Sequence, residues 1–254
     1  MYRVRKRIKQ SNLLVISDSH QAIDAAFTSV IRHRAALEAY MRSHPIFQLA
    51  LDPVVVDSDA PRLVQLAAGA AEIAGVGPMA AIPGAIAELA VETMLSTGSS
   101  VNLVENGGEI AATSTSPLNV GVYAGRSAFS GRVGFSLSPL DFPLGIATSS
   151  ASVSHALNFG LADAAVIVAD TASMADAVAK AASNAVSGDD CEASVQSGLE
   201  AVEKIGHVRG ALIIRDRFIG IVGKLPKLIR VEGTGEEMLR AGLHSIVAPN
   251  ATIL

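Results

Sequence analysis

Residues Ala162–Val168 form the segment that constrains the fold most, because they are almost continuously apolar over the length of one strand. Such a strand is buried on both faces and lies inside a sheet. The rest of the chain mixes predicted strands and helices without strict alternation, which favours an α+β fold over a doubly wound one. We therefore expect one α+β domain over residues 1–254, with a central mixed or antiparallel sheet flanked by helices.

The composition limits the partners and the location of the protein. Half of the 254 residues are hydrophobic, 4% are aromatic and the net charge is −4, so nonspecific binding of nucleic acid is not expected. The single cysteine, Cys191, excludes an intramolecular disulfide and a cysteine-based zinc site. The apolar stretch 63–95 carries Glu72, Glu88 and Glu92, which argues against a membrane span. We expect a cytoplasmic protein that does not bind membranes, since no signal-peptide apolar region follows the basic N-terminus.

Periodicity predicts the individual elements. The expected strands cover residues 2–9, 13–16, 101–104, 109–113, 120–123, 133–137, 162–168, 208–215 and 218–222, with another at Ile146. The expected helices cover residues 20–43, 61–75, 85–95, 171–186 and 192–205. His44-Pro45 should end the first helix, and Asp59 is placed to cap the second.

The first strand is basic on one side, where Arg3, Arg5, Arg7 and Lys9 alternate with apolar residues. A solvated edge strand explains this charge without any ligand and is the favoured interpretation. The alternative is an anion site.

Three segments contain residues suited to binding a ligand. The first contains Gly75, Gly77, Pro78, Met79 and Gly84, just before and within the start of a predicted helix. Small residues let a ligand approach the backbone, and a helix start offers free N–H groups and a positive dipole end. Tight packing between helices is the alternative, and it is favoured for this segment taken alone.

The second segment is a turn, Asn106, Gly107 and Gly108, with Glu105 before it and Glu109 after it. Asn-Gly is a strong hairpin signal, but two flanking carboxylates exceed what a turn needs. They could meet a cation or a ribose hydroxyl.

The third segment runs from Thr148, Ser149 and Ser150 to His155. Its hydroxyls and backbone N–H groups suit phosphate oxygens. No nucleophile elbow is present, so a serine hydrolase is not indicated.

These segments, in this order, resemble a family of ApbE-like proteins, distant relatives of the ApbE flavin transferases. The resemblance covers almost the whole chain. Its anchors are Gly75-Val-Gly-Pro-Met-Ala-Ala, Val104-Glu-Asn-Gly-Gly-Glu-Ile, Ala147-Thr-Ser-Ser with His155, Phe159-Gly-Leu-Ala-Asp-Ala, and Ala175-Asp-Ala-Val-Ala.

The resemblance implies a flavin site. The transferases use FAD and magnesium, and they pass the FMN phosphate to a protein threonine. Their glycine-rich loop resembles residues 77–84, their Asn-x-Gly-Gly-Asp turn resembles 106–109, and their His-Ile-x-Asp-Pro segment resembles 155–158. Their magnesium helix resembles 175–180, which makes Asp176 the metal candidate.

The chain also departs from that pattern. Lys180 stands where threonine is expected, and an ammonium group repels or replaces a metal ion. Ala147 stands in place of an expected cysteine, and Ala151 and Ser154 in place of glycines. These changes argue against catalysis and against magnesium more than against binding.

Two functions of different class follow from the resemblance. The first is a protein that binds FAD, FMN or another phosphate-bearing small molecule in a glycine-rich cleft without catalysis. The second is an active enzyme, either for magnesium-dependent FMN transfer from FAD or for a step in sulfide assimilation. The expected partner is a small-molecule ligand, and a second copy of the chain, forming a homodimer, is a further candidate.

Overall fold

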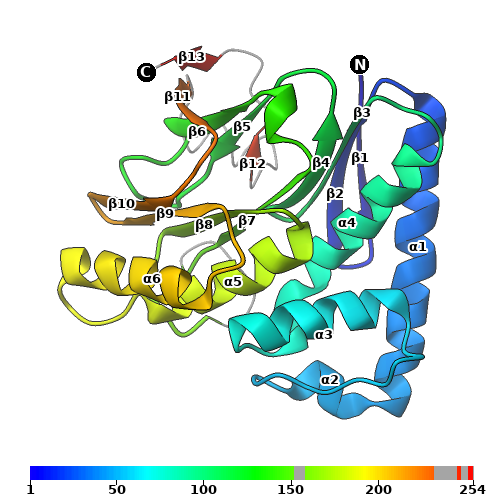
Figure 1. Cartoon of the computed structure of the whole chain (residues 1–254), viewed down its shortest axis with the longest axis horizontal. Helices are drawn as coiled ribbons and strands as arrows, with labels where there is room; N and C mark the ends of the chain where they lie inside the picture. The colour runs from blue at the N-terminus through cyan, green and yellow to red at the C-terminus, as the bar shows by residue number, and fades with distance from the viewer. Residues whose placement is uncertain (152–157, 232–244, 247–250, 254) are drawn as a thin grey trace.

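The structure, a computed structural model, describes residues 1–151, 158–231, 245–246 and 251–253. The protein is built in three layers (Figure 1). An eight-stranded sheet lies in the middle, with strand order β1-β2-β3-β4-β7-β8-β9-β10. Helices cover one face of this sheet, and a five-stranded sheet, β12-β5-β6-β11-β13, covers the other (Figure 1). Every described strand pair is antiparallel, so of the two predicted sheet types the antiparallel one is present. The α+β prediction is confirmed.

The bounds of the elements follow. The large sheet contains β1 (Tyr2–Ile8), β2 (Ser11–Ser17), β3 (Val101–Asn106), β4 (Glu109–Ser114), β7 (Leu144–Ser149), β8 (Ala164–Ala169), β9 (Gly210–Arg215) and β10 (Phe218–Gly223). The small sheet contains β5 (Leu118–Val122), β6 (Val133–Leu137), β11 (Lys227–Val231), β12 (Ser245–Ile246) and β13 (Ala251–Ile253). The helices are α1 (His20–Ser43), α2 (Pro45–Leu49), α3 (Arg62–Ala74), α4 (Ile82–Leu95), α5 (Ala172–Ala185) and α6 (Cys191–Ile205), with short 3₁₀ helices η1 (Pro78–Ala81) and η2 (Pro139–Asp141).

Successive side chains of the central strands point to opposite faces of the large sheet, so each face has its own hydrophobic core. In β8, Ala165 and Ile167 face the helices, whereas Val166 and Val168 face the small sheet. All four side chains are fully buried, and β8 lies between β7 and β9. The prediction of an interior strand near 162–168 is therefore confirmed.

Several predicted boundaries were wrong for local reasons. Asp59 does not cap α3, because the helix begins after Pro61 and no side chain bonds its first N–H groups. The helix expected from residue 85 begins at Ile82, directly after η1, because Pro83 is accepted in a first helical turn. Two elements, α2 and β11, were not predicted, because each is only five residues long and shows no clear periodicity.

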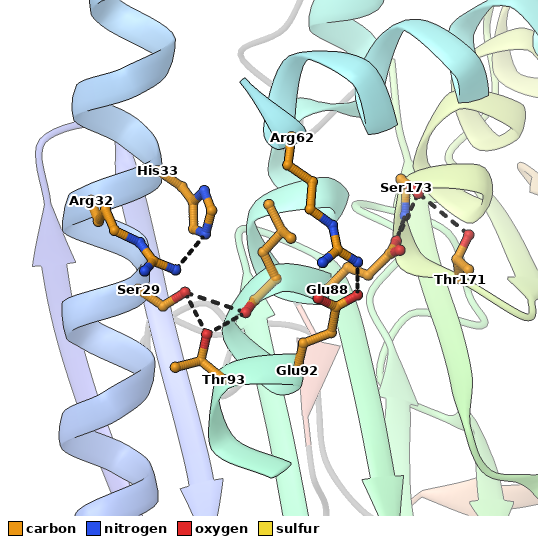
Figure 2. Close-up of polar contacts among 10 residues, drawn as sticks. Ser29, Arg32, His33, Arg62, Glu88, Glu92, Thr93, Thr171 and Ser173 are labelled. Atoms are coloured by element: carbon orange, nitrogen blue, oxygen red, sulfur yellow. Dashed lines mark hydrogen bonds and ion pairs between the residues drawn. The ribbon is translucent and has the colours of Figure 1, made fainter. Parts of the chain in front are cut away.

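Polar contacts hold α4 against its neighbours in the helical layer (Figure 2). Ser29 of α1 donates a 3.2 Å hydrogen bond to the carbonyl of Leu89, and Thr93 donates one of 2.9 Å to Ser29. On the other side, Ser173 of α5 donates a 2.7 Å hydrogen bond to Glu88. Arg62 of α3 forms a 2.7 Å ion pair with Glu92, which Figure 2 also shows. These contacts fix the position of α4, whose first turn borders the candidate site.

The stretch Pro78–Leu95 is apolar and long enough to cross a membrane, judged by length and composition alone. In this fold 61% of it is buried. It packs against α1, α3, α5 and the strands β3 and β4, which is the position of a core helix in a soluble-type domain.

Candidate functional site

A cavity of about 980 Å³ opens at one end of the large sheet. The β1–β2 turn, the β3–β4 turn and the end of β7 meet there, and α1, α4 and α5 close the sides. Its lining includes apolar side chains from α1 and the η1–α4 segment, namely Leu37, Met41, Met79, Ile82 and Ile86. This volume lies at the upper end of the range for small-molecule sites.

The β3–β4 turn brings its polar residues to the cavity. Gly107 and Gly108 both have positive φ angles, 77° and 118°, which a two-residue hairpin turn of this kind requires. Asn106 is buried and donates a 3.0 Å hydrogen bond to the carbonyl of Pro83 in α4. The predicted turn is confirmed, and this bond ties it to the start of α4.

The start of α4 is already satisfied by the protein itself. The Gly84 N–H donates a 2.8 Å hydrogen bond to Oδ2 of Asp176 in α5. The Ile82 N–H donates to the carbonyl of Met79, and Pro83 has no N–H. The first three residues of α4 therefore offer no free backbone donor to a phosphate, although the sequence analysis expected such donors.

Asp176, Glu109 and Lys180 form a charged group beside α4, in which Asp176 is buried and the other two residues are half-buried. Burial raises the pKa of Asp176 to about 8, although the Gly84 N–H and the Lys180 ammonium act in the opposite direction. Burial also raises the pKa of Glu109 well above its usual value, and the charges of Asp176 and Glu105 add to this shift. Burial lowers the pKa of Lys180. Two carboxyl groups that repel each other in a dry site hold a proton near neutral pH.

These residues do not fit a resident magnesium ion. Magnesium takes oxygen ligands in octahedral geometry, and one Asp176 oxygen already accepts the Gly84 N–H. The Lys180 ammonium interacts with both Asp176 and Glu109, and it can only donate hydrogen bonds. Among the described residues there is no group of three or more His, Cys, Asp or Glu side chains placed to hold a metal.

The opposite end of the cavity is basic. Arg7, Lys9 and Arg34 line it together with Glu38. Lys9 pairs with Glu38 at 2.5 Å, and Arg34 lies 3.8 Å from the same carboxylate. Three cations thus face one anion, so this end carries excess positive charge.

The structure brings together most of the residues singled out from the sequence. The cavity lining contains Met79, Asn106, Gly107, Gly108, Glu109, Thr148, Ser149, Ser150 and Asp176. It does not contain Gly75, Gly77, Pro78 or Gly84. His155 lies outside the described residues.

Backbone packing explains the glycines that do not line the cavity. A Cβ atom on Gly77 would lie 2.0 Å from the carbonyl oxygen of Ala50, and one on Gly84 would lie 2.2 Å from that of Ala172. Gly75 ends α3 in the left-handed conformation, with φ of 67°. The alternative of tight packing therefore describes Gly77 and Gly84, whereas Gly75 ends a helix, which the sequence interpretation did not include.

An anion site on the first strand was only the alternative interpretation, and Arg34 and Tyr123 were not among the predicted site residues, although both line the cavity. β1 is an edge strand, as expected, yet Arg7 and Lys9 also line the cavity. Arg34 interrupts the apolar stripe of α1 and points to the β1–β2 turn through bonds to Ser11 and Gln10. This charged residue within an apolar stripe was the sequence signal that could have assigned Arg34 to the site.

The fold and the cavity define an ApbE-like α+β protein. The family model described as "AbpE bacteria" matches residues 2–207, so the chain belongs to this family. A UPF0280 protein of Methanococcoides burtonii is 38% identical over 226 residues, which cover 89% of this chain and 94% of the relative. A UPF0280 protein of Methanopyrus kandleri is 38% identical over 236 residues, covering 92% of this chain and 95% of that protein.

Two solved structures share the fold at low sequence identity. The flavinyl transferase ApbE of Pseudomonas stutzeri superposes with a TM-score of 0.56 and 13% identity, covering 87% of this chain and 93% of that one. The ApbE protein of Thermotoga maritima has a TM-score of 0.56 and 14% identity, covering 88% of this chain and 96% of that one. At this identity the likeness shows the fold alone.

Proposed function

We propose that this protein binds a flavin nucleotide, or another phosphate-bearing small molecule, in the cavity at the end of the large sheet. The observation that carries the proposal is the combination of one basic end with an apolar wall in a cavity of about 980 Å³. An apolar wall with a few convergent polar groups is typical of a small-molecule site. The fold shared with the flavinyl transferase ApbE of Pseudomonas stutzeri is what favours a flavin among such molecules.

The apolar wall suits a flat ring system. Met79, Ile82 and Ile86 come from the η1–α4 segment, Leu37 and Met41 come from α1, and Tyr123 adds an aromatic ring. Methionine side chains adapt their shape and make favourable contacts with aromatic rings. Thr148, Ser149 and Ser150 also line the cavity and supply hydroxyl groups for polar atoms of the ligand.

Titration of the purified protein with FMN, FAD and ADP by isothermal calorimetry tests this proposal. We expect at least one of the three to bind with a dissociation constant in the micromolar range. Binding should raise the melting temperature when the ligand is in excess, because only the folded protein binds it. Failure of all three to bind or to shift the melting temperature would contradict the proposal.

The second candidate is catalysis of flavin transfer. It is favoured by Asp176, whose pKa of about 8 is that of a group that exchanges a proton near neutral pH, and by the neighbouring Glu109, whose pKa burial also raises. Incubation with FAD and magnesium, followed by chromatography, distinguishes the two functions. Release of AMP from FAD would support the enzyme, whereas binding without turnover supports a binding protein. As a soluble-type domain it would act in the cytoplasm.

A further inference from the structure

The β1–β2 turn and α1 form a rigid basic corner in the cavity. Lys9 has a positive φ of 53° in the turn, directly before Gln10. Arg34 crosses from α1 and donates to the Ser11 hydroxyl at 2.9 Å and to the Gln10 side-chain oxygen. The Arg34 side chain is 12% exposed, so the protein holds it in place.

Two arginines in this corner have donors available. Arg7 is exposed, and in the described part of the chain only its Nε makes a hydrogen bond, to the Lys9 carbonyl at 3.1 Å. The Nε of Arg34 is buried and has no hydrogen-bond partner among the described residues. Solvent does not reach that atom, so Arg34 offers a ligand the Nη1 and Nη2 N–H groups that its bonds to Ser11 and Gln10 leave over.

The other end of the cavity disfavours an anion. Asp176 and Glu109 contribute carboxyl groups there, with Lys180 as their counter-charge. The N–H of Gly84, which could otherwise bind a phosphate oxygen, is bonded to Asp176. An anionic ligand group therefore finds excess positive charge at the β1–β2 turn, whereas at α5 the carboxyl groups of Asp176 and Glu109 compensate the Lys180 ammonium.

We propose that Arg7 and Arg34 form a phosphate subsite between the β1–β2 turn and α1. The ligand lies with its phosphate at this corner and its uncharged end toward Asp176 and Glu109. A guanidinium group suits this role because its fork of N–H donors matches phosphate oxygens. This inference rests on the proposed function and adds the orientation of the ligand.

The test compares each phosphate ligand with its phosphate-free analogue. Calorimetry with FMN and riboflavin, and with ADP and adenosine, gives the part of the affinity that depends on phosphate. We expect the wild type to bind FMN or ADP at least tenfold more tightly than the analogue. Arg7→Gln should weaken FMN or ADP binding about tenfold and leave the analogue unchanged. Comparison of FMN with ADP shows whether the subsite prefers a phosphate monoester or a diphosphate.

Two further variants make the result specific. Arg3→Gln removes the same charge from the same strand, outside the cavity, and should change affinity less than twofold. Arg34→Lys keeps the positive charge but loses the guanidinium fork. It should weaken the binding of FMN or ADP and leave the affinity for riboflavin or adenosine unchanged.

The outcomes separate the two proposals. If FMN or ADP binds the wild type and Arg7→Gln leaves the affinity ratio to the analogue unchanged, the subsite is overturned and the proposed function stands. If no phosphate ligand binds the wild type, both are overturned. An equal loss for ligand and analogue in Arg7→Gln also overturns the subsite, because it indicates a general effect on the fold.

Discussion

The Asp176 carboxylate accepts a 2.8 Å hydrogen bond from the backbone N–H of Gly84, although the two residues are 92 positions apart in the chain. This bond joins α5 to the first turn of α4 at the wall of the cavity. A helix N-terminus attracts anions. Here a carboxyl group of the protein itself occupies the helix N-terminus, which leaves the basic corner as the place where an anion from solution finds uncompensated positive charge.

Gly84→Ala should destabilise the protein by about 1 to 3 kcal/mol, the usual cost of overpacking a core. The added Cβ would lie 2.2 Å from the Ala172 carbonyl oxygen and 2.9 Å from the Asp176 Cβ, so α4 and α5 must move apart. Gly69→Ala in α3 is the matched control, because a Cβ there meets nothing within 4 Å. It should be neutral or stabilising by about 0.5 to 1 kcal/mol. Chemical denaturation measures both, and equal stability of the two variants would contradict the packing role of Gly84.

Asp176→Asn should make the protein more stable at pH 9 and change it little at pH 4. Burial raises the pKa of Asp176 from its ordinary value of 3.8 to about 8 in the folded protein. A raised folded-state pKa means that the stability present below pH 4 is lost as the pH rises through about 8. Asparagine never ionises, keeps an oxygen for the Gly84 N–H and removes the charge that repels Glu109. The expected gain at pH 9 is on the order of 5 kcal/mol, because the pKa is shifted by about four units, and it should appear as a clear rise in melting temperature.

Melting curves between pH 4 and pH 9 measure this difference. Asp24→Asn is a suitable control, since it removes an exposed carboxyl group from α1. A wild type that gains stability relative to Asp176→Asn as the pH rises would refute the predicted sign.

Lys180→Thr should improve magnesium binding. Lys180 follows Asp176 by four positions in α5, so both side chains lie on one helix face. The substitution removes a positive charge that interacts with Asp176 and Glu109 and supplies an oxygen ligand. Titration calorimetry with and without FAD should show weak binding by the wild type and tighter binding by the variant.

Lys180→Met separates charge from coordination, because it removes the ammonium group without adding an oxygen. The magnesium affinity of Lys180→Met should lie between that of the wild type and that of Lys180→Thr. Tight binding of magnesium by the wild type, unchanged in both variants, would show that Lys180 does not replace the metal.

The sequence predicted the central strand, the Asn-Gly-Gly turn and the helix that carries Asp176, because each of these depends on local signals. Hydrophobic runs place a strand such as β8, and an Asn-Gly-Gly turn or a helical Asp176 keeps its local form in any context. The small sheet was only partly predicted, since β11 is short and pairs with β6 about 90 residues earlier. Small residues also do not reveal whether a ligand or a neighbouring helix requires them, as Gly77 and Gly84 show. The role of Arg34 needed the tertiary contact between α1 and the β1–β2 turn.

Arg209 provides a last test, because it joins the segment before β7 to β9 through three different acceptors. Its Nη1 donates to the Asp141 carbonyl at 2.5 Å, its Nη2 to the Pro143 carbonyl at 2.6 Å, and its Nε to the Asp170 carboxylate at 2.7 Å.

The Asp170 side chain is 82% exposed, so its ion pair with Arg209 should contribute little to stability in water. Arg209→Lys, which cannot reach all three acceptors, should cost about 1 to 2 kcal/mol through the lost carbonyl bonds. Asp170→Asn removes only the charge and should cost less than about 0.5 kcal/mol. Urea unfolding of the two variants decides between carbonyl bonds and ion pairing, and a loss in Asp170→Asn as large as that in Arg209→Lys would assign the stability to the ion pair.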